Sequence, residues 1–268
     1  MKTTGMIMGI FLMLLMIASC DRDNGPTKPK TSDELTPWAE MNGASNSAQD
    51  DVQAAGCCYG ILSNRWPYVS GTKWVTMTLS SKYASFDPGW KSIANNSALA
   101  AMGQWHWASN ANIGFYYHTT LTSINSMTYD GYNVIGARYW DGPGKILAVA
   151  GAWINSRTGK VMEVDIIVDT ADPWGVLGES NKFDLWSVMT HELGHVWRLA
   201  DLYSSSCYWE SMYGYGSKGK TYQRTLYCGD KQGVQTLYGY KVRTAAAQYA
   251  GNGASEPPRP IAVVSNEE

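Results

Sequence analysis

The sequence predicts an α+β domain in which helices pack on a twisted, mixed β-sheet. Two observations lead to this prediction. Short segments with strand-like alternation recur through the middle of the chain, and two longer segments have helical spacing or a sustained apolar run. The chain has 268 residues, of which 44% are hydrophobic, so it contains enough apolar material for one sizeable core. Its net charge of -2 and its 16% of charged residues give no indication of a nucleic-acid partner.

The first 20 residues are typical of an export signal. Lys2 precedes the apolar run 6–19, which is too short to cross a bilayer comfortably as a helix. The run ends in Ala18-Ser19-Cys20, which resembles the lipobox of bacterial lipoproteins, a family in which the cysteine is lipidated. A plain secretory signal is the alternative. Either interpretation predicts an exported protein, which is lipid-anchored in the bacterial cell envelope, at the outer membrane or cell surface, or is secreted.

Composition divides the remainder of the chain into three parts. Residues 21–56 are polar and rich in Pro, Gly, Ser and Thr, which predicts a tether between the anchor and the folded part. Residues 243–268 have a similar bias and are expected to form a loosely ordered tail. A single domain is therefore expected over residues 57–242.

The domain begins with a strand and a helix. The segment 73–79, KWVTMTL, has strand chemistry, with β-branched residues in partial alternation. Within 89–110, apolar residues recur at spacings of three and four from Ala94 to Ala108, which predicts an amphipathic helix. Three strand candidates follow at 112–118, 133–140 and 146–153.

A hairpin and a buried helix complete this series. Residues 156–160 predict a turn whose glycine adopts a positive φ. In the strand 160–169 that follows, apolar residues alternate with Glu163 and Asp165. An exposed strand face accounts for these two acids as well as a bound ion or substrate would. Residues 183–199 are long and apolar enough for a buried helix.

Export favours disulfides among the cysteines that remain after Cys20, because their number is even. The pair Cys207–Cys228 is preferred, since it would close a loop just after the histidine motif. A loop of that length is stabilised by about 3 kcal/mol on a chain-entropy argument. The adjacent Cys57 and Cys58 either form a vicinal bridge or each pair elsewhere.

Residues 190–201 read THELGHVWRLAD. On a helix, His191 and His195 lie one turn apart on the same face, so their imidazoles can converge on one metal ion. Glu192 lies too far round the helix to join them and is expected to act as general base toward a metal-bound water. The motif is flanked by apolar residues, and a buried histidine pair without a partner would be costly. The pattern therefore favours a zinc site.

The third zinc ligand is less certain from the residues. Catalytic zinc usually has three protein ligands and one open position, but no histidine follows His195. Asp201 is the nearest downstream candidate, and Glu210 is the alternative. His106, upstream, falls inside the predicted helix 89–110 and is expected to pack there.

These motifs resemble the metzincin clan of zinc peptidases. HELGHVWRLAD is similar to the metzincin consensus HExxHxxGxxH, and to the snapalysin-like variant with aspartate as third ligand. The stretch FDLWSVMTHELGH is closer still to matrixin-type metalloendopeptidases. Met212, within Ser-Met-Tyr-Gly, looks like the methionine of the Met-turn that underlies the zinc in that clan. Residues 226–239 are similar to the C-terminal helix of matrixins, so the resemblance covers roughly residues 66–240.

The resemblance implies a metzincin-like catalytic domain. Its twisted mixed sheet would carry a long helix and an active-site helix, and a small C-terminal subdomain would end in a helix. One catalytic zinc ion, bound by His191, His195 and Asp201, would act with Glu192 on polypeptide substrates. The strand 146–153 would be the edge that pairs with an extended substrate. A monomer is expected, and nothing in the residues supports a structural calcium ion.

One departure from the consensus is Arg198, which replaces the glycine that ends the helix with a positive φ. A non-glycine residue adopts this conformation at a cost of about 1 kcal/mol, so the turn remains accessible. The alternative reading is a non-catalytic zinc-binding surface lipoprotein on the same scaffold, with Arg198 as an early mark of lost activity. The intact HExxH motif favours a zinc-dependent metalloendopeptidase that hydrolyses extracytoplasmic proteins.

Overall fold

The computed structural model describes residues 57–90, 96–118 and 120–241, together with the backbone of four short strands at 36–37, 39–41, 52–54 and 263–264. The predicted lipidation site Cys20 lies outside the described residues, as do the rest of the tether and of the tail. Among the helices of the described part, none is long and apolar enough to cross a membrane.

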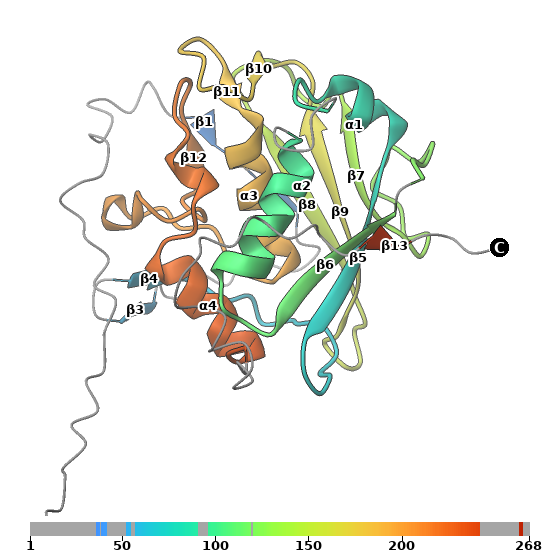
Figure 1. Cartoon of the computed structure of the whole chain (residues 1–268), viewed down its shortest axis with the longest axis vertical. Helices are drawn as coiled ribbons and strands as arrows, with labels where there is room; N and C mark the ends of the chain where they lie inside the picture. Colours follow the sequence, from blue (N-terminus) through green and yellow to red (C-terminus); the bar gives the residue numbers. More distant parts are fainter. Residues whose placement is uncertain are drawn as a thin grey trace, which may run out of the picture.

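The structure is an α+β fold built on one mixed sheet, which confirms the predicted fold class (Figure 1). The strand order in the sheet is β13-β6-β5-β7-β9-β8-β2. Strand β8 is antiparallel to β9, whereas the other pairs are parallel. The strands are β2 (Ala39–Met41), β5 (Lys73–Leu79), β6 (Ile113–His118), β7 (Asn133–Arg138), β8 (Ala148–Ile154), β9 (Val161–Asp169) and β13 (Val263–Val264).

Three two-stranded pairs lie outside this sheet. Strand β1 (Thr36–Pro37) pairs antiparallel with β12 (Tyr215–Gly216). Strand β3 (Val52–Ala54) pairs antiparallel with β4 (Cys57–Tyr59), and β10 (Trp174–Gly175) pairs parallel with β11 (Phe183–Asp184). The N-terminal strands β1 and β2 therefore pair with two separate parts of the domain, β12 and the outer edge of β8.

Helices α2 and α3 lie side by side on one face of the sheet (Figure 1). The predicted helix over 89–110 is shorter in the structure, since α2 begins at Ser97, where the side chain of Asn96 caps it by accepting from Leu99 N. A helix that was not predicted, α1, follows β5 directly. The helices are α1 (Ser81–Phe86), α2 (Ser97–Gly103), α3 (Leu185–Val196) and α4 (Cys228–Tyr238), with a π-helical turn η4 (Gln104–Ala108) and 3-10 turns η5 (Ser205–Cys207) and η6 (Tyr222–Arg224).

The two acids of β9 are buried, so of the two alternatives considered for them the exposed strand face is wrong. Glu163 is 1% exposed and Asp165 is fully buried, whereas the neighbouring Met162 is 49% exposed. The loop before β7 folds over this face, and its backbone amides donate to both carboxylates. Thr128 N of this loop and Val134 N of β7 donate to Asp165 at 3.1 and 2.7 Å. Burial raises the pKa of Asp165 to about 7. A strand pattern cannot predict a distant loop of this kind.

Two disulfides connect β4 to the C-terminal part of the chain, and the predicted pair Cys207–Cys228 is wrong. Cys57 pairs with Cys228, and Cys58 pairs with Cys207, with Cα–Cα distances of 5.3 and 5.5 Å. Successive side chains of a strand point to opposite sides, so the adjacent cysteines of β4 reach different partners. One partner begins α4, and the other ends η5. A vicinal Cys57–Cys58 bridge is excluded by the same pairing.

Candidate metal centre

Helix α3 positions the histidine motif at the centre of the molecule. It is capped by Asp184, whose side chain accepts hydrogen bonds from Ser187 N and from Arg224 Nε, each at 2.8 Å. Nearly all of its residues are buried between α2, β8 and the C-terminal part of the chain. Trp105 of η4 donates to the carbonyl of Thr190, just before the first histidine. The helix is therefore fixed at its start and along its length.

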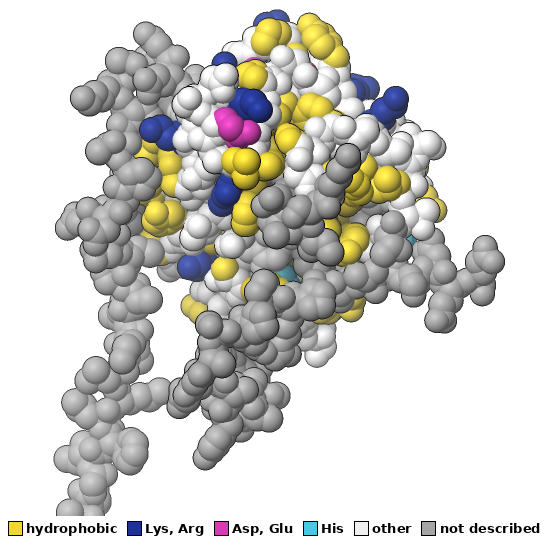
Figure 2. All heavy atoms as spheres, turned by 45° about the horizontal axis from the view of Figure 1, so that its top comes forward, with side chains coloured by type: hydrophobic (Ala, Val, Ile, Leu, Met, Phe, Trp, Pro, Cys, Tyr) yellow, Lys and Arg dark blue, Asp and Glu magenta, His cyan; other side chains and the backbone are white. Residues whose placement is uncertain are grey.

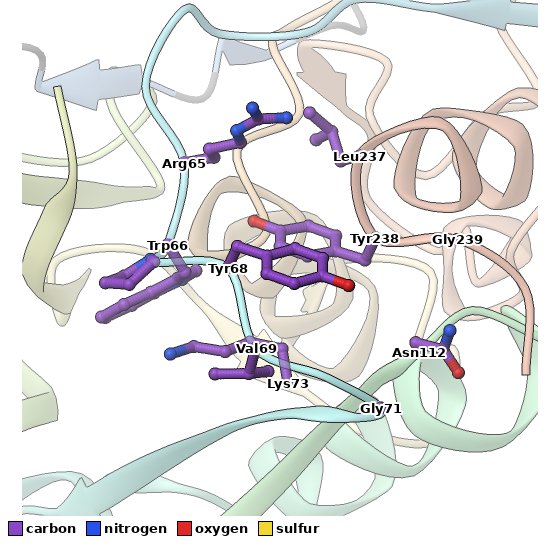
Figure 3. Close-up of a pocket in the computed structure, with 11 residues that line it drawn as sticks. Arg65, Trp66, Tyr68, Val69, Gly71, Lys73, Asn112, Leu237, Tyr238 and Gly239 are labelled. Carbon is purple, nitrogen blue, oxygen red and sulfur yellow. The ribbon is translucent and has the colours of Figure 1, made fainter.

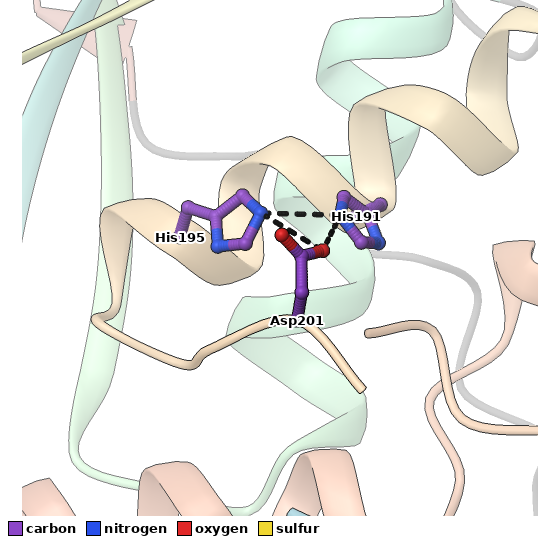
Figure 4. Close-up of side chains that lie close together, drawn as sticks. All are labelled: His191, His195 and Asp201. Atoms are coloured by element: carbon purple, nitrogen blue, oxygen red, sulfur yellow. Dashed lines mark hydrogen bonds and ion pairs between the residues drawn. The ribbon is translucent and has the colours of Figure 1, made fainter. Parts of the chain in front are cut away.

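His191 and His195 lie one turn apart, with their Nε2 atoms 3.1 Å from each other (Figure 4). The Nδ1 atom of His191 is 2.8 Å from the carbonyl oxygen of Ser211, and that of His195 is 2.8 Å from the carbonyl oxygen of Leu199. A carbonyl only accepts, so each Nδ1 carries the hydrogen and donates it. Both Nε2 atoms consequently present lone pairs toward one point, which is the arrangement of two metal ligands.

Asp201 completes the group, as Figure 4 shows. Its Oδ1 lies 2.9 Å from His191 Nε2 and 3.6 Å from His195 Nε2. One ligand atom from each of the three residues lies within 4.8 Å of the others. Donors bound to one tetrahedral zinc ion lie about 3.3–3.5 Å apart, so the three side chains fit zinc in number, type and spacing.

The protonation states of these ligands also suit a cation. Burial lowers the pKa of His191 to about 4, so its imidazole is neutral near pH 7. Burial opposes ionisation of Asp201, but the two histidines outweigh it and hold the pKa of Asp201 below its usual range. A neutral imidazole and an ionised carboxylate are ordinary ligand forms for zinc.

Arg198 forms the turn that brings Asp201 back to the histidines. Its φ is 69°, which is the left-handed conformation expected where the consensus has glycine. Its backbone N–H donates to the carbonyl of His195, and its carbonyl accepts from Leu62 N, each at 2.9 Å. The side chain is 1% exposed. The turn therefore forms without glycine. The arginine side chain fills buried space that a glycine at this position would leave empty.

Met212 lies beneath the histidine pair. A Cβ added at Gly194, which lies between His191 and His195, would collide with the sulfur of Met212. The glycine of the HELGH motif thus leaves room for the thioether against the metal-binding helix. The preceding residue, Ser211, provides the carbonyl that orients His191. Met212 thus packs against the helix that carries both histidines, and its role in a Met-turn stays a prediction.

Glu210, the alternative third ligand, does not join the cluster. Its Oε2 accepts from Gly229 N and Asp230 N at 3.0 and 3.2 Å, at the start of α4. His106 also packs elsewhere, as predicted, with its Nδ1 3.0 Å from the carbonyl of Ile113. Asp230, whose carboxylate accepts from Ser211 N and Met212 N, was not identified from the sequence. No local motif indicated these two contacts, because Ser211 and Met212 lie about twenty residues away along the chain.

Glu192 is fully buried and lies in the same helical turn as His191. On a helix, adjacent side chains diverge by about 100°, so Glu192 flanks the point where the histidines converge. Its role as general base stays a prediction.

A separate pocket of about 450 Å³ is lined by residues of the segments 65–73 and 237–239 and by Asn112 (Figure 3). Two of its aromatic residues hold the C-terminal end of α3: Trp66 Nε1 donates to the carbonyl of Val196 at 2.8 Å, and Tyr238 Oη donates to that of Trp197 at 3.2 Å. The pocket contains none of the three clustered ligands. It therefore belongs to the support of the helix and not to the ligand cluster.

The described surface visible in Figure 2 carries many hydrophobic side chains, with Lys and Arg scattered among them.

Comparison with known protein families identifies the family to which the chain belongs. The sequence model of the matrixin peptidase family matches residues 75–239, which is more than half of the chain and includes most of β5, helix α3 and α4. A search of curated proteins found no significant match. The matched region contains the clustered His191, His195 and Asp201, and zinc is the metal that matrixins use. The chain therefore belongs to the matrixin family.

Proposed function

We propose that this matrixin is a zinc-dependent metalloendopeptidase that hydrolyses peptide bonds in proteins outside the cytoplasm. The observation that carries the proposal is the convergence of His191, His195 and Asp201 on one point in a family of peptidases. The three side chains would hold the ion. When bound, zinc would supply Lewis acidity for the substrate carbonyl and for the attacking water.

The protein's own residues would carry the proton and orient the ligands. Glu192 would take the proton from the attacking water and deliver it to the leaving amine, as a general base and then a general acid. Ser211 and Leu199 would keep the two imidazoles in the tautomer that leaves each Nε2 free to bind the metal.

Strand β8 supports an extended substrate in this proposal. It packs against α3, and its antiparallel contact with β9 leaves one edge facing away from the rest of the sheet core. The N-terminal strand β2 pairs with that edge in the parallel direction at Val149, Ala150 and Gly151. The edge is thus able to accept an additional strand by backbone hydrogen bonding.

The alternative of a non-catalytic zinc-binding protein was based on Arg198, interpreted as a sign that catalytic activity had been lost. Because Arg198 adopts the conformation that the turn requires, it gives this alternative no support.

The test is cleavage of casein or gelatin by the full chain, with bound zinc quantified, in wild type, Glu192→Gln and Glu179→Gln. Glu192→Gln keeps the shape of the side chain but removes the base, so zinc content should persist while cleavage falls by about 100-fold or more. Glu179, an acid outside the cluster, serves as the matched control and should change neither. A wild type without zinc, or a Glu192→Gln variant that cleaves normally, would rule out the proposal.

We also propose that Cys20 carries a lipid that anchors the protein in the bacterial cell envelope. The support is the apolar run 6–19 followed by Ala18-Ser19-Cys20. Labelling with a fatty-acid analogue should mark wild type and not Cys20→Ser; equal labelling of both would contradict the anchor.

A further inference from the structure

Two buried carboxyl groups lie beneath the Met-turn and are not part of the ligand cluster. Glu210 is 5% exposed and Asp230 is 1% exposed. Both lie where the segment before Met212 meets the first turn of α4. Burying a carboxyl group destabilises the folded state unless the group makes several hydrogen bonds. Both carboxyl groups accept such bonds from backbone amides.

Asp230 holds the backbone of the Met-turn with both of its oxygens. Oδ2 accepts from Ser211 N at 2.7 Å and from Tyr227 N at 2.9 Å, and Oδ1 accepts from Met212 N at 3.2 Å. The carbonyl of the same Ser211 accepts from His191 Nδ1 at 2.8 Å. A single residue, Ser211, therefore connects the carboxylate of Asp230 to the imidazole of a metal ligand.

Glu210 holds the other side of the same junction. Its Oε2 accepts from Gly229 N and Asp230 N, the free amides of the first turn of α4. Its own backbone carbonyl accepts from Tyr213 N and closes the turn around Met212. Glu210 thus connects the first turn of α4, which contains Asp230, to the turn around Met212.

The two groups influence each other's ionisation. Burial, with the charge of Asp230 as the next cause, raises the pKa of Glu210 above its usual value, and burial also raises that of Asp230. The cysteines of β4 and α4 that pack against the pair are disulfide-bonded and do not titrate. The pair therefore retains a proton at a pH where exposed carboxyl groups have lost theirs.

We propose that Glu210 and Asp230 are positioning residues for the metal centre, which act through the Ser211 peptide to fix the imidazole of His191. This inference rests on the proposed zinc site but adds residues outside it. A ligand held by a backbone carbonyl is only as well oriented as the segment that carries the carbonyl. Through their hydrogen bonds to the backbone around Met212, Glu210 and Asp230 fix the position of the Ser211 carbonyl.

The first experiment compares Asp230→Asn with Asp165→Asn in the full chain. An asparagine at 230 can accept on one oxygen only, so an amide of Ser211 or Met212 loses its partner. Asp165 is an equally buried carboxyl that also binds two backbone amides on separate oxygens, but its partners lie in the loop before β7 and at the start of β7 itself. Zinc affinity, measured by competition with a chelator, should fall by about 10–100-fold in Asp230→Asn and stay within about twofold in Asp165→Asn.

A second measurement does not require zinc. In the metal-free protein, nitrogen-15 NMR should detect a slowly exchanging Nδ1–H of His191, because it donates to Ser211. The signal should persist in Asp165→Asn and disappear in Asp230→Asn. If both variants keep the signal, or both lose it, the positioning role is wrong. If wild type shows the signal but binds no zinc, the proposed zinc site is wrong while the positioning of His191 stands.

Glu210→Gln tests the shared proton. Glutamine resembles the protonated acid, so zinc affinity near neutral pH should match wild type within about twofold. As pH rises to about 9, wild type should lose affinity when Glu210 ionises beside Asp230, whereas Glu210→Gln should lose less. A role limited to stability would leave the two pH profiles parallel. Parallel profiles would therefore remove Glu210 from the proposal.

Discussion

Asp201 Oδ1 lies 2.9 Å from His191 Nε2, even though the turn between them is made by an arginine and not by a glycine. The distance depends on the left-handed conformation of Arg198, which reverses the chain after α3. The position of the predicted third ligand and the departure from the family consensus thus depend on one structural feature, and both can be tested by substitution.

Asp201→Ala should remove one of the three ligands without disturbing the histidine pair. Both imidazoles keep their Nδ1 hydrogen bonds to backbone carbonyls, so the fold of α3 should persist. We expect zinc affinity to fall by more than about 100-fold, beyond the effect of losing an outer-shell partner. Glu179→Ala is the control, and unchanged affinity in Asp201→Ala would exclude Asp201 as a ligand.

Arg198→Gly should destabilise the protein even though it restores the consensus residue. Relief of the positive φ is worth about 1 kcal/mol, whereas removal of a fully buried large side chain typically costs about 2–5 kcal/mol. Asn110→Gly is the matched control, because Asn110 also has a positive φ, of 52°, but is exposed. Its unfolding free energy should stay within about 0.5 kcal/mol of wild type. If Arg198→Gly were more stable than wild type, the buried arginine side chain would not contribute to the free energy of unfolding.

The disulfide pairing can be determined by counting free thiols in double cysteine variants that also carry Cys20→Ser. Cys57→Ala with Cys228→Ala removes one bridge and should leave no free thiol, because Cys58 and Cys207 remain paired. Cys57→Ala with Cys207→Ala should leave two free thiols, one from each broken bridge. Losing one long-range bridge should lower Tm by on the order of 10 °C. Two thiols in the first variant would contradict the observed pairing.

Asp165 should make stability depend on pH. Its pKa is raised to about 7 in the folded state, so the folded protein binds more protons than the unfolded chain between about pH 4 and pH 7. The contribution to stability is complete below the unfolded pKa and is lost as pH rises through 7. Denaturant unfolding across this range should therefore show a smaller loss of free energy in Asp165→Asn than in wild type. Equal slopes would show that Asp165 titrates normally.

Local pattern was sufficient to predict much of this fold. The five central strands β5 to β9 have alternation or β-branched residues, and α3 is a long apolar run, so each is specified by its own sequence. Helix α1 has only six residues and was missed, because a single short turn carries little periodicity. The clustered ligands were predictable since two of them are one turn apart on a helix.

What the sequence failed to predict depends on contacts between distant segments. Cys207 and Cys228 were wrongly paired with each other, because the position of β4 between η5 and the start of α4 is a property of the assembled domain. Glu163 and Asp165 are buried by a loop that no strand pattern encodes. Asp230 looked like an ordinary acid in the first turn of a helix, and only its contacts with Ser211 and Met212 distinguish it.

The pairing of β2 with β8 has a consequence for any measurement of substrate affinity. A peptide that adds to the outer edge of β8 must first displace the backbone of Ala39–Met41, which is part of the same chain. The apparent dissociation constant is then the intrinsic one divided by the fraction of molecules in which this edge is open. Such internal competition is independent of protein concentration, so dilution does not relieve it. Affinities measured with and without the N-terminal strands accordingly report two different equilibria.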